Sequence, residues 1–164
     1  MQTQQLGENT TFSKASPLGA NTVCPLMANA SVGALAWDFA DVRTFLHDRE
    51  GVSIDDLNDM EREYGRYMKL VAENRNVKLP VSPPVDQFWH AHILFSRDYT
   101  NFSQKMMGTY IHHYPALTQE ERIRLAPDYE LTRRLYCEKF EVPDEKWWPS
   151  DCICSSCTGP GGSV

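Results

Sequence analysis

The residues best able to do chemistry in this 164-residue sequence are histidines and cysteines, and both types are clustered. Four of the five histidines fall within 24 residues, and three of the five cysteines fall within six: His90, His92, His112 and His113, then Cys152, Cys154 and Cys157. Imidazole nitrogens and thiolate sulfurs are the usual protein ligands of Zn²⁺ and related ions. The clustering therefore predicts a site for a transition metal, with zinc as the first choice.

The first histidine pair lies in a segment whose apolar pattern predicts a helix. At 100° per residue, Asp86 and His90 share one helix face, whereas His90 and His92 point about 160° apart. Two side chains on opposite faces cannot easily hold one ion. A regular helix therefore offers at most one of these two histidines as a ligand.

Two ligand arrangements are consistent with this geometry. In the first, His92 faces the core and meets His112 or His113 from the connector that follows. In the second, Asp86 and His90 form a ligand pair, or a ligand and the carboxylate that orients it. Adjacent side chains diverge, so one of the two connector histidines is expected at the surface. If no metal binds, His92 is a core residue bonded to a backbone carbonyl, and Asp86 only stabilises the helix start.

The three clustered cysteines form a C-x-C-x-x-C arrangement near the end of the chain. Thiolates at this spacing can wrap Zn²⁺ or Cu⁺ with three sulfurs and take a fourth ligand from elsewhere. Alternatively, these cysteines have no role or form an adventitious disulfide. The preceding Trp147 and Trp148 are expected to dock on the body of the protein, which would allow the tail to reach the histidines.

The elements that must position these residues are predicted to be helices. Apolar spacing, capping residues and prolines predict five of them, over residues 35–48, 53–73, 85–107, 118–125 and 127–140. Ser53 and Thr118 are expected to open capping boxes, the first together with Asp56, and Gly108 is expected to end the third helix. Cys137 falls in the last helix and is expected to be a small buried residue.

The predicted fold class is all-α, a compact bundle of about four to five helices. The helical domain is expected over residues 35–150. An extended arm, 1–34, precedes it, and a Cys/Gly-rich tail, 151–164, follows it. The arm is either mobile or draped over the body or a protein partner, and the tail is a second candidate contact for a partner.

Composition and charge exclude several classes of function. The net charge of −6 and the pI of about 5.3 do not suit a protein that binds nucleic acid, which needs a basic face. No run of 18 apolar residues predicts a membrane span. The lack of a secretory signal and the odd number of cysteines favour a reducing, cytoplasmic location.

Part of the sequence resembles a known family. The run Trp89-His-Ala-His-Ile-Leu94, then Arg97-Asp-Tyr99, Gly108 and Ile111-His-His-Tyr-Pro115, is similar to the glycine-rich-domain-protein-like family, and specifically to its small bacterial-type members. The resemblance covers about residues 35–115. It implies that His90, His92 and one of the two connector histidines belong to the family signature, but it transfers no chemistry. The long glycine-rich region and RNA-binding segments of the plant members are absent from this chain.

The leading hypothesis from the sequence is a small soluble protein that binds zinc in a structural or carrier role. No nucleophile elbow, phosphate loop, dinucleotide fingerprint or H-E-x-x-H motif assigns a reaction. Two alternatives remain open at this point. One is an accessory subunit of a larger assembly that binds no metal, and the other is a small metal-dependent enzyme.

Overall fold

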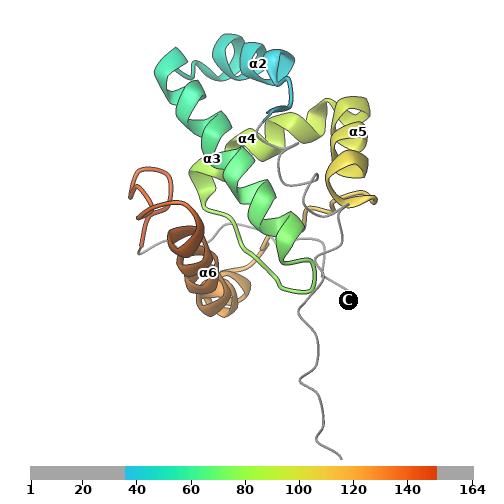
Figure 1. The fold of residues 1–164 in the computed structure, drawn as a ribbon. Coiled ribbons are helices and arrows are strands. Elements are labelled where there is room, and N and C mark those ends of the chain that lie inside the picture. The colour runs from blue at the N-terminus through green and yellow to red at the C-terminus, as the bar shows by residue number, and fades with distance from the viewer. Residues whose placement is uncertain (1–35, 151–164) are drawn as a thin grey trace, which may run out of the picture.

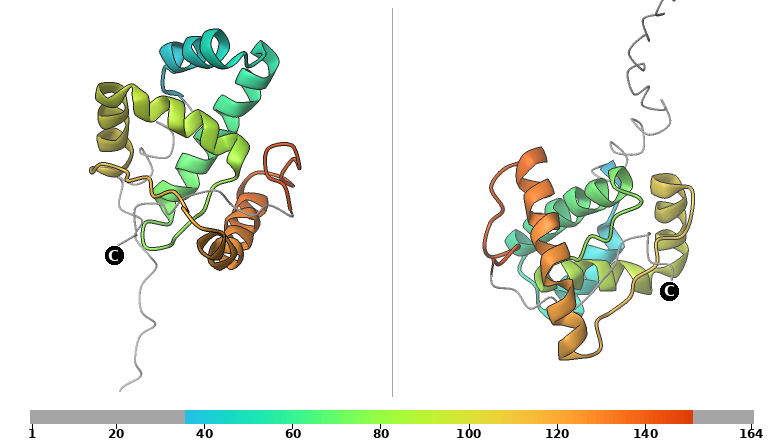
Figure 2. Two further views of the ribbon diagram at one scale, coloured as in Figure 1. Left: turned by 180° about the vertical axis from the view of Figure 1, so that it is seen from behind. Right: turned by 90° about the horizontal axis from the view of Figure 1, so that it is seen from below.

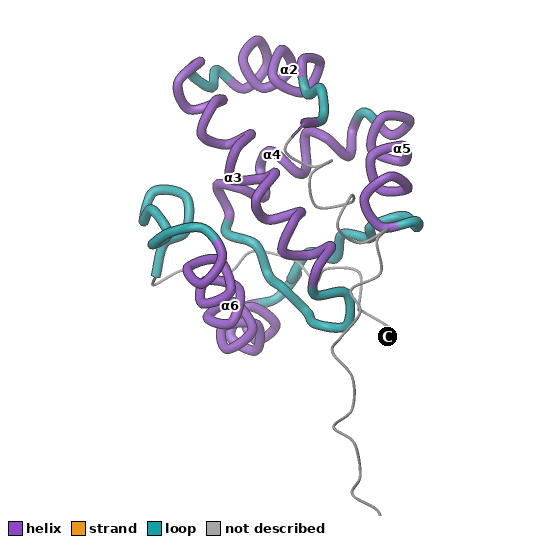
Figure 3. Tube along the Cα trace, viewed as in Figure 1, coloured by secondary structure: helices purple, strands orange, loops and turns teal. Residues whose placement is uncertain are grey.

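The computed structural model describes residues 36–150, which form five helices joined by short connectors (Figure 1). They are α2 (Ala40–Glu50), α3 (Ile54–Glu73), α4 (Pro83–Leu94), α5 (Ser96–Met107) and α6 (Gln119–Lys139). This part of the chain contains no strand, which confirms the predicted all-α class (Figure 3). None of its helices is long and apolar enough to cross a membrane. The predicted arm and tail lie outside the described residues.

Helix α4 lies at the centre of the arrangement. It packs against α2, α3 and α5, whereas α6 lies beside α3 (Figures 1 and 2). The core between these helices is strongly aromatic, and Tyr64, Phe88, Trp89 and Phe102 are fully buried in it. Because α4 has helices on several sides, the side chains of its histidine segment are held by neighbours from separate parts of the chain.

The predicted helix-end signals are largely confirmed. The Ser53 hydroxyl accepts a hydrogen bond from the backbone N–H of Asp56 at 3.2 Å, and Thr118 makes a reciprocal capping box. The Asp56 carboxylate pairs with the Lys146 ammonium at 2.5 Å, so the reciprocal half expected at the start of α3 does not form there. Gly108 ends α5 with a φ of 71°, a left-handed conformation that glycine adopts without strain.

Two helix boundaries in the first half differ from the prediction. Helix α2 begins at Ala40 instead of 35, and the helix predicted over 85–107 is interrupted at Phe95, which has φ −85° and ψ 61°. On one continuous helix, residues 92 and 98 would point about 120° apart. The interruption redirects α5, so that the His92 ring and the Asp98 carboxylate form a hydrogen bond across the bend.

The last two predicted helices are a single helix, α6, with Pro127 inside it. Proline removes one backbone donor and normally breaks a helix. Here Ile123, whose carbonyl loses its partner, and Pro127 are both exposed, so water can bond the freed oxygen. Cys137, on the same helix, is exposed, and the expectation that it is buried was wrong. Its place on the outer face of α6 leaves it outside the core.

Candidate metal centre

Three side chains with metal-binding atoms converge beside α4. Asp86 lies in the first turn of this helix, His90 lies one turn later, and His113 comes from the connector between α5 and α6. One ligand atom from each residue lies within 4.8 Å of the other two. The structure therefore brings together three of the sequence-predicted ligands, in the second of the two arrangements, with one connector histidine added.

The start of α4 fixes Asp86. Ser82 and the two prolines that follow begin the helix, and the Asp86 backbone N–H donates to the Ser82 carbonyl at 2.9 Å. Proline suits these first positions because the backbone N–H groups there have no helical partner. The Asp86 side chain is 4% exposed, so its carboxylate is oriented by its surroundings.

His113 is positioned by two aromatic side chains from α4 and α5. The Trp89 indole lies 4.6 Å from the His113 ring, centroid to centroid, and donates to the Tyr99 hydroxyl at 2.9 Å. That hydroxyl donates to the backbone carbonyl of Ile111 at 2.6 Å. The Ile111 side chain is buried as well. The anchored Ile111 and the Trp89 contact together hold this part of the connector, with His113, against α4.

Two distances within the cluster can be compared with those around a tetrahedral ion. His113 Nε2 lies 2.8 Å from Asp86 Oδ1, and His90 Nδ1 lies 3.5 Å from Asp86 Oδ2. A tetrahedral zinc with bonds of about 2.0 Å separates its ligand atoms by roughly 3.3 Å. The two separations lie on either side of this value, but they involve different oxygens of Asp86. An ion held by one of these oxygens and both imidazoles would therefore require the side chains to shift.

Exposure differs sharply among the three residues. Asp86 and His113 are 4% and 8% exposed, whereas the His90 side chain is 54% exposed. The centre is therefore buried on two sides and open to solvent beside His90. Without a metal, His113 Nε2 must carry the proton of its hydrogen bond, because a carboxylate only accepts. A bound ion would take the place of that proton.

His92, one of the predicted ligands, does not lie in this centre. It lies on the other face of α4, fully buried, between Tyr64 and Asp98. His92 Nε2 donates to Asp98 Oδ2 at 2.9 Å, so Nδ1 is unprotonated and accepts from the Tyr64 hydroxyl, also at 2.9 Å. Burial lowers the pKa of His92, although the hydrogen bond to Asp98 opposes that shift. This histidine fastens α4 to α3 and α5.

The lowered pKa of His92 predicts a loss of stability in mild acid. Below pH about 6.5 the unfolded chain takes up a proton on this imidazole that the folded protein resists. The free energy of unfolding should therefore fall by up to about 1.4 kcal/mol per pH unit as the pH drops from 6.5. Urea unfolding of the metal-free protein between pH 5 and pH 8 (a range chosen around that value) measures this slope.

A pair of variants assigns the slope to its source. His92→Gln keeps a donor and an acceptor but cannot be charged, so this variant should have a flatter acid profile than the parent. His112→Gln removes an exposed imidazole and should keep the parent profile. Equal slopes in the two variants would contradict the role of His92.

His112 also lies apart from the cluster. It is exposed and contacts the rings of Tyr110 and Tyr114, at centroid distances of 5.1 and 6.0 Å. The structure therefore places this predicted ligand outside the cluster, and the expectation that one connector histidine faces outward is confirmed. The predicted ligands Cys152, Cys154 and Cys157 lie outside the described residues.

Sequence reasoning missed the residues that position the ligands. Trp89 and Tyr99 hold the connector, and both lie in the segments quoted above for the family resemblance. An aromatic residue next to a histidine in a helical segment was the available signal. Their effect on His113 depends on a contact with residues more than ten positions away, which no local pattern contains.

The comparisons with known proteins place this region within one family. A family model described as UCP032817-like matches residues 31–146, which is more than half of the chain. The chain belongs to the UCP032817-like family. No curated protein and no solved structure gives a significant match. The segment matched by the UCP032817-like model includes Asp86, His90 and His113, whereas the resemblance to glycine-rich domain proteins stays a prediction.

The centre in this UCP032817-like protein has a defined chemical capacity. Two imidazole nitrogens and one carboxylate oxygen suit zinc, and the same set with open positions also occurs at non-haem iron sites. Three protein ligands leave at least one coordination position for water or another donor. The open side beside His90 is where such a donor would enter.

Proposed function

We propose that this protein binds one zinc ion through Asp86, His90 and His113. The observation that carries the proposal is the convergence of one ligand atom from each residue within 4.8 Å, with two of the three side chains nearly buried. Buried carboxylate and imidazole groups held in place lose little freedom when an ion binds. This is the preorganisation that a specific metal site requires.

The proposed role is structural or that of a carrier, and the fourth ligand decides between them. Structural zinc sites are closed by four protein ligands, whereas sites with an open position exchange ligands with solvent or substrate. The described residues supply three ligands and leave the side beside His90 open. With water as the fourth ligand, the ion would be exchangeable, as a carrier needs.

A cysteine of the tail is the proposed alternative to water, and the described residues before the tail support it. The Ser82 hydroxyl donates to the backbone carbonyl of Trp147, and the Trp148 indole is fully buried. The Trp147–Trp148 segment is therefore docked on the helices, as the sequence predicted. Ser82 precedes Asp86 by four residues, a rise of about 6 Å along a helix. Cys152 follows Trp147 by five residues, which span up to about 17 Å when extended.

Replacing Cys152, Cys154 and Cys157 with serine tests this fourth ligand. If a tail thiolate coordinates the ion, zinc affinity should fall on the order of tenfold or more, the lower end of losses seen for supporting contacts at metal sites. The variant should also lose the near-ultraviolet sulfur-to-metal band of the cobalt-substituted protein. Unchanged affinity and spectrum would leave water as the fourth ligand and favour the carrier role. A reducing cytoplasm, the proposed location, would keep these thiols available.

The zinc proposal itself is tested with protein purified without a polyhistidine tag. Elemental analysis and calorimetric titration of the chelator-treated protein should give about one zinc per chain. Binding should also raise the thermal unfolding midpoint, because a ligand specific for the folded state stabilises it. Correctly folded protein that binds far less than one equivalent of zinc would exclude the proposal.

A further inference from the structure

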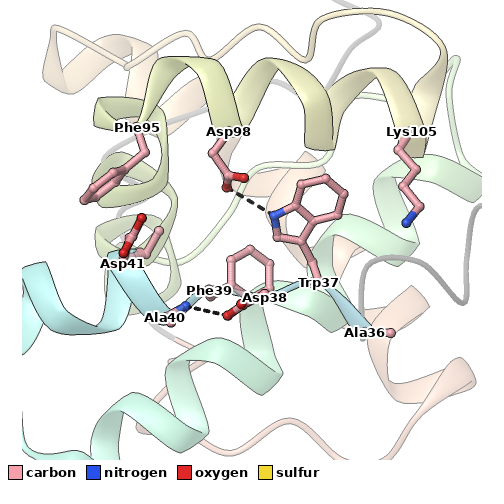
Figure 4. Close-up of a pocket in the computed structure, with 10 residues that line it drawn as sticks. Ala36, Trp37, Asp38, Phe39, Ala40, Asp41, Phe95, Asp98 and Lys105 are labelled. Carbon is pink, nitrogen blue, oxygen red and sulfur yellow. Dashed lines mark hydrogen bonds between the residues drawn. The ribbon is translucent and has the colours of Figure 1, made fainter.

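A cleft of about 420 Å³ lies along α5, between this helix and the segment that leads into the first turn of α2 (Figure 4). Its volume is in the range of pockets that hold small molecules, roughly 300–1,000 Å³. Trp37, Phe39 and Phe95 contribute aromatic side chains to the lining. The cleft borders Asp98, so it lies on the His92 side of α4, away from the proposed metal centre. Its ligand is a question separate from zinc.

Carboxylates outnumber cationic groups in this cleft. Asp38, Asp41 and Asp98 line it together with one ammonium group, that of Lys105. Within residues 36–150, no Lys or Arg nitrogen comes within 4.0 Å of the Asp41 or Asp98 carboxylate. The lining therefore carries negative charge that the described protein does not neutralise.

The Asp98 carboxylate is held in a fixed direction. Its Oδ2 accepts a hydrogen bond from His92 Nε2 at 2.9 Å. The same oxygen accepts from the Trp37 indole N–H at 3.1 Å (Figure 4). The side chain is nevertheless 44% exposed, so part of it faces the cleft. A carboxylate with one oxygen anchored and the group still accessible is prepared to bind a donor from a ligand.

The aromatic wall already binds a cation. The Lys105 ammonium lies 5.2 Å from the centroid of the Trp37 ring, within the range of a cation–π interaction. Figure 4 shows Lys105 at one end of the cleft, with Asp41 and Phe95 towards the other. Phe95 thus offers a second aromatic face close to an acidic side chain that has no cationic partner among the described residues.

We propose that this cleft binds a small organic cation, an ammonium group carried on an apolar or aromatic body. The ammonium would be bound by the carboxylates of Asp98 and Asp41, and the apolar body would pack against Trp37 and Phe95. Carboxylates select the charge and the aromatic rings select the body, which is how sites for alkylammonium ligands work. The site takes one ligand molecule per chain.

Three probes of matched shape and different charge test the proposal: 2-phenylethylammonium, neutral 2-phenylethanol and anionic phenylacetate. The readout is the ¹H–¹⁵N resonance of the Trp37 indole N–H, which donates to Asp98 and so reports on the cleft. The cation should bind at least on the order of tenfold more tightly than the neutral probe, which corresponds to about 1.4 kcal/mol. The anion should not bind.

Charge variants should move the affinity of the cation in opposite directions. Asp41→Asn removes a cleft carboxylate that makes no hydrogen bond within the described structure, and it should weaken binding several-fold without affecting the fold. Lys105→Met removes the competing ammonium and should strengthen binding. Asp55→Asn on α3, an exposed aspartate away from the cleft, is the matched control and should change nothing.

The outcomes separate the proposal from simple hydrophobic binding. Equal affinity for the cation and the neutral probe, or no response to Asp41→Asn and Lys105→Met, would overturn it. Asp98→Asn is a further test variant, and it should reduce the affinity for the cation. Circular dichroism verifies that this variant is folded. All measurements use zinc-free and zinc-loaded protein in parallel, and the same result in both would confirm that the cleft is independent of the metal centre.

Discussion

Replacing Asp86 with alanine should lower the affinity for zinc at least on the order of 100-fold, because even contacts outside the coordination shell cost 10- to 100-fold at metal sites. The effect of losing Asp86 is expected to be large because this residue contacts both other proposed ligands. Its Oδ1 accepts from His113 and its Oδ2 faces His90. The substitution removes one ligand and the partner that orients the other two. Calorimetric titration with zinc at constant pH measures the loss.

The adjacent histidines of the connector provide the matched control. His113→Ala should lose affinity to a similar degree, whereas His112→Ala should keep that of the parent, because its ring lies against tyrosines outside the cluster. His90→Ala removes the exposed ligand and leaves the buried pair intact. It therefore tests the site even if Asp86→Ala disturbs the fold. Zinc affinity that is equal in the His112 and His113 variants would refute the assignment of the centre.

Helical periodicity predicted much of this centre, because it is a local property. A spacing of four residues places Asp86 and His90 on one face in any regular helix, and a spacing of two separates His90 from His92. The structure confirms both relations. What periodicity could not decide was whether a metal ligand or a core hydrogen bond occupies the inner face, and the inner His92 proved to be the hydrogen-bonded one.

The choice between His112 and His113 lay beyond the sequence for a physical reason. It depends on which way the connector faces, and that direction is set by the Tyr99 hydroxyl bond to the Ile111 carbonyl and by the contact of Trp89 with His113. These contacts join elements that come together only in the folded chain. The sequence gives the order of the residues along the connector, but it does not show which side of the connector faces the core.

The interruption of the predicted third helix has a similar cause. Phenylalanine is not a helix-breaking residue, and the helical spacing of apolar residues continues beyond Phe95. The bend is stabilised by contacts that form across it. His92 and Asp98 form a hydrogen bond, and the Phe95 ring packs against that of Phe45 with the ring centroids 6.1 Å apart. Tertiary contacts override a continuous helical pattern here. The same bend creates a wall of the cleft proposed to bind an ammonium ligand.

Replacing Glu63 with alanine should destabilise the protein by about 3 kcal/mol, a large part of the stability of an ordinary domain. Glu63 is 2% exposed and accepts hydrogen bonds from the Tyr136 hydroxyl at 2.5 Å and the Trp148 indole at 3.0 Å. Arg66 and Arg62 lie 3.2 Å from its other oxygen. One carboxylate thus joins α3, α6 and the segment that follows α6.

The expected loss comes from the donors left without a partner. A buried donor that loses its acceptor costs about 1–3 kcal/mol, and Tyr136 and Trp148 would both be in that position. Tyr136 remains a donor because burial and the neighbouring Glu63 charge raise its pKa. Glu63→Gln keeps an acceptor oxygen and nearly the same shape, so it should cost less than the alanine variant.

Glu141→Ala is the matched control, because Glu141 binds the same Arg66 but is 63% exposed. An exposed ion pair contributes at most about 1 kcal/mol, so its removal should change the free energy of unfolding little. Urea denaturation followed by tryptophan fluorescence and by circular dichroism measures all three variants. If Glu63→Ala proved no less stable than Glu141→Ala, the buried carboxylate could not be what holds α6 and the Trp147–Trp148 segment to α3. Those elements would then depend on their other contacts, among them the packing of Trp148 against Tyr67 and Tyr136.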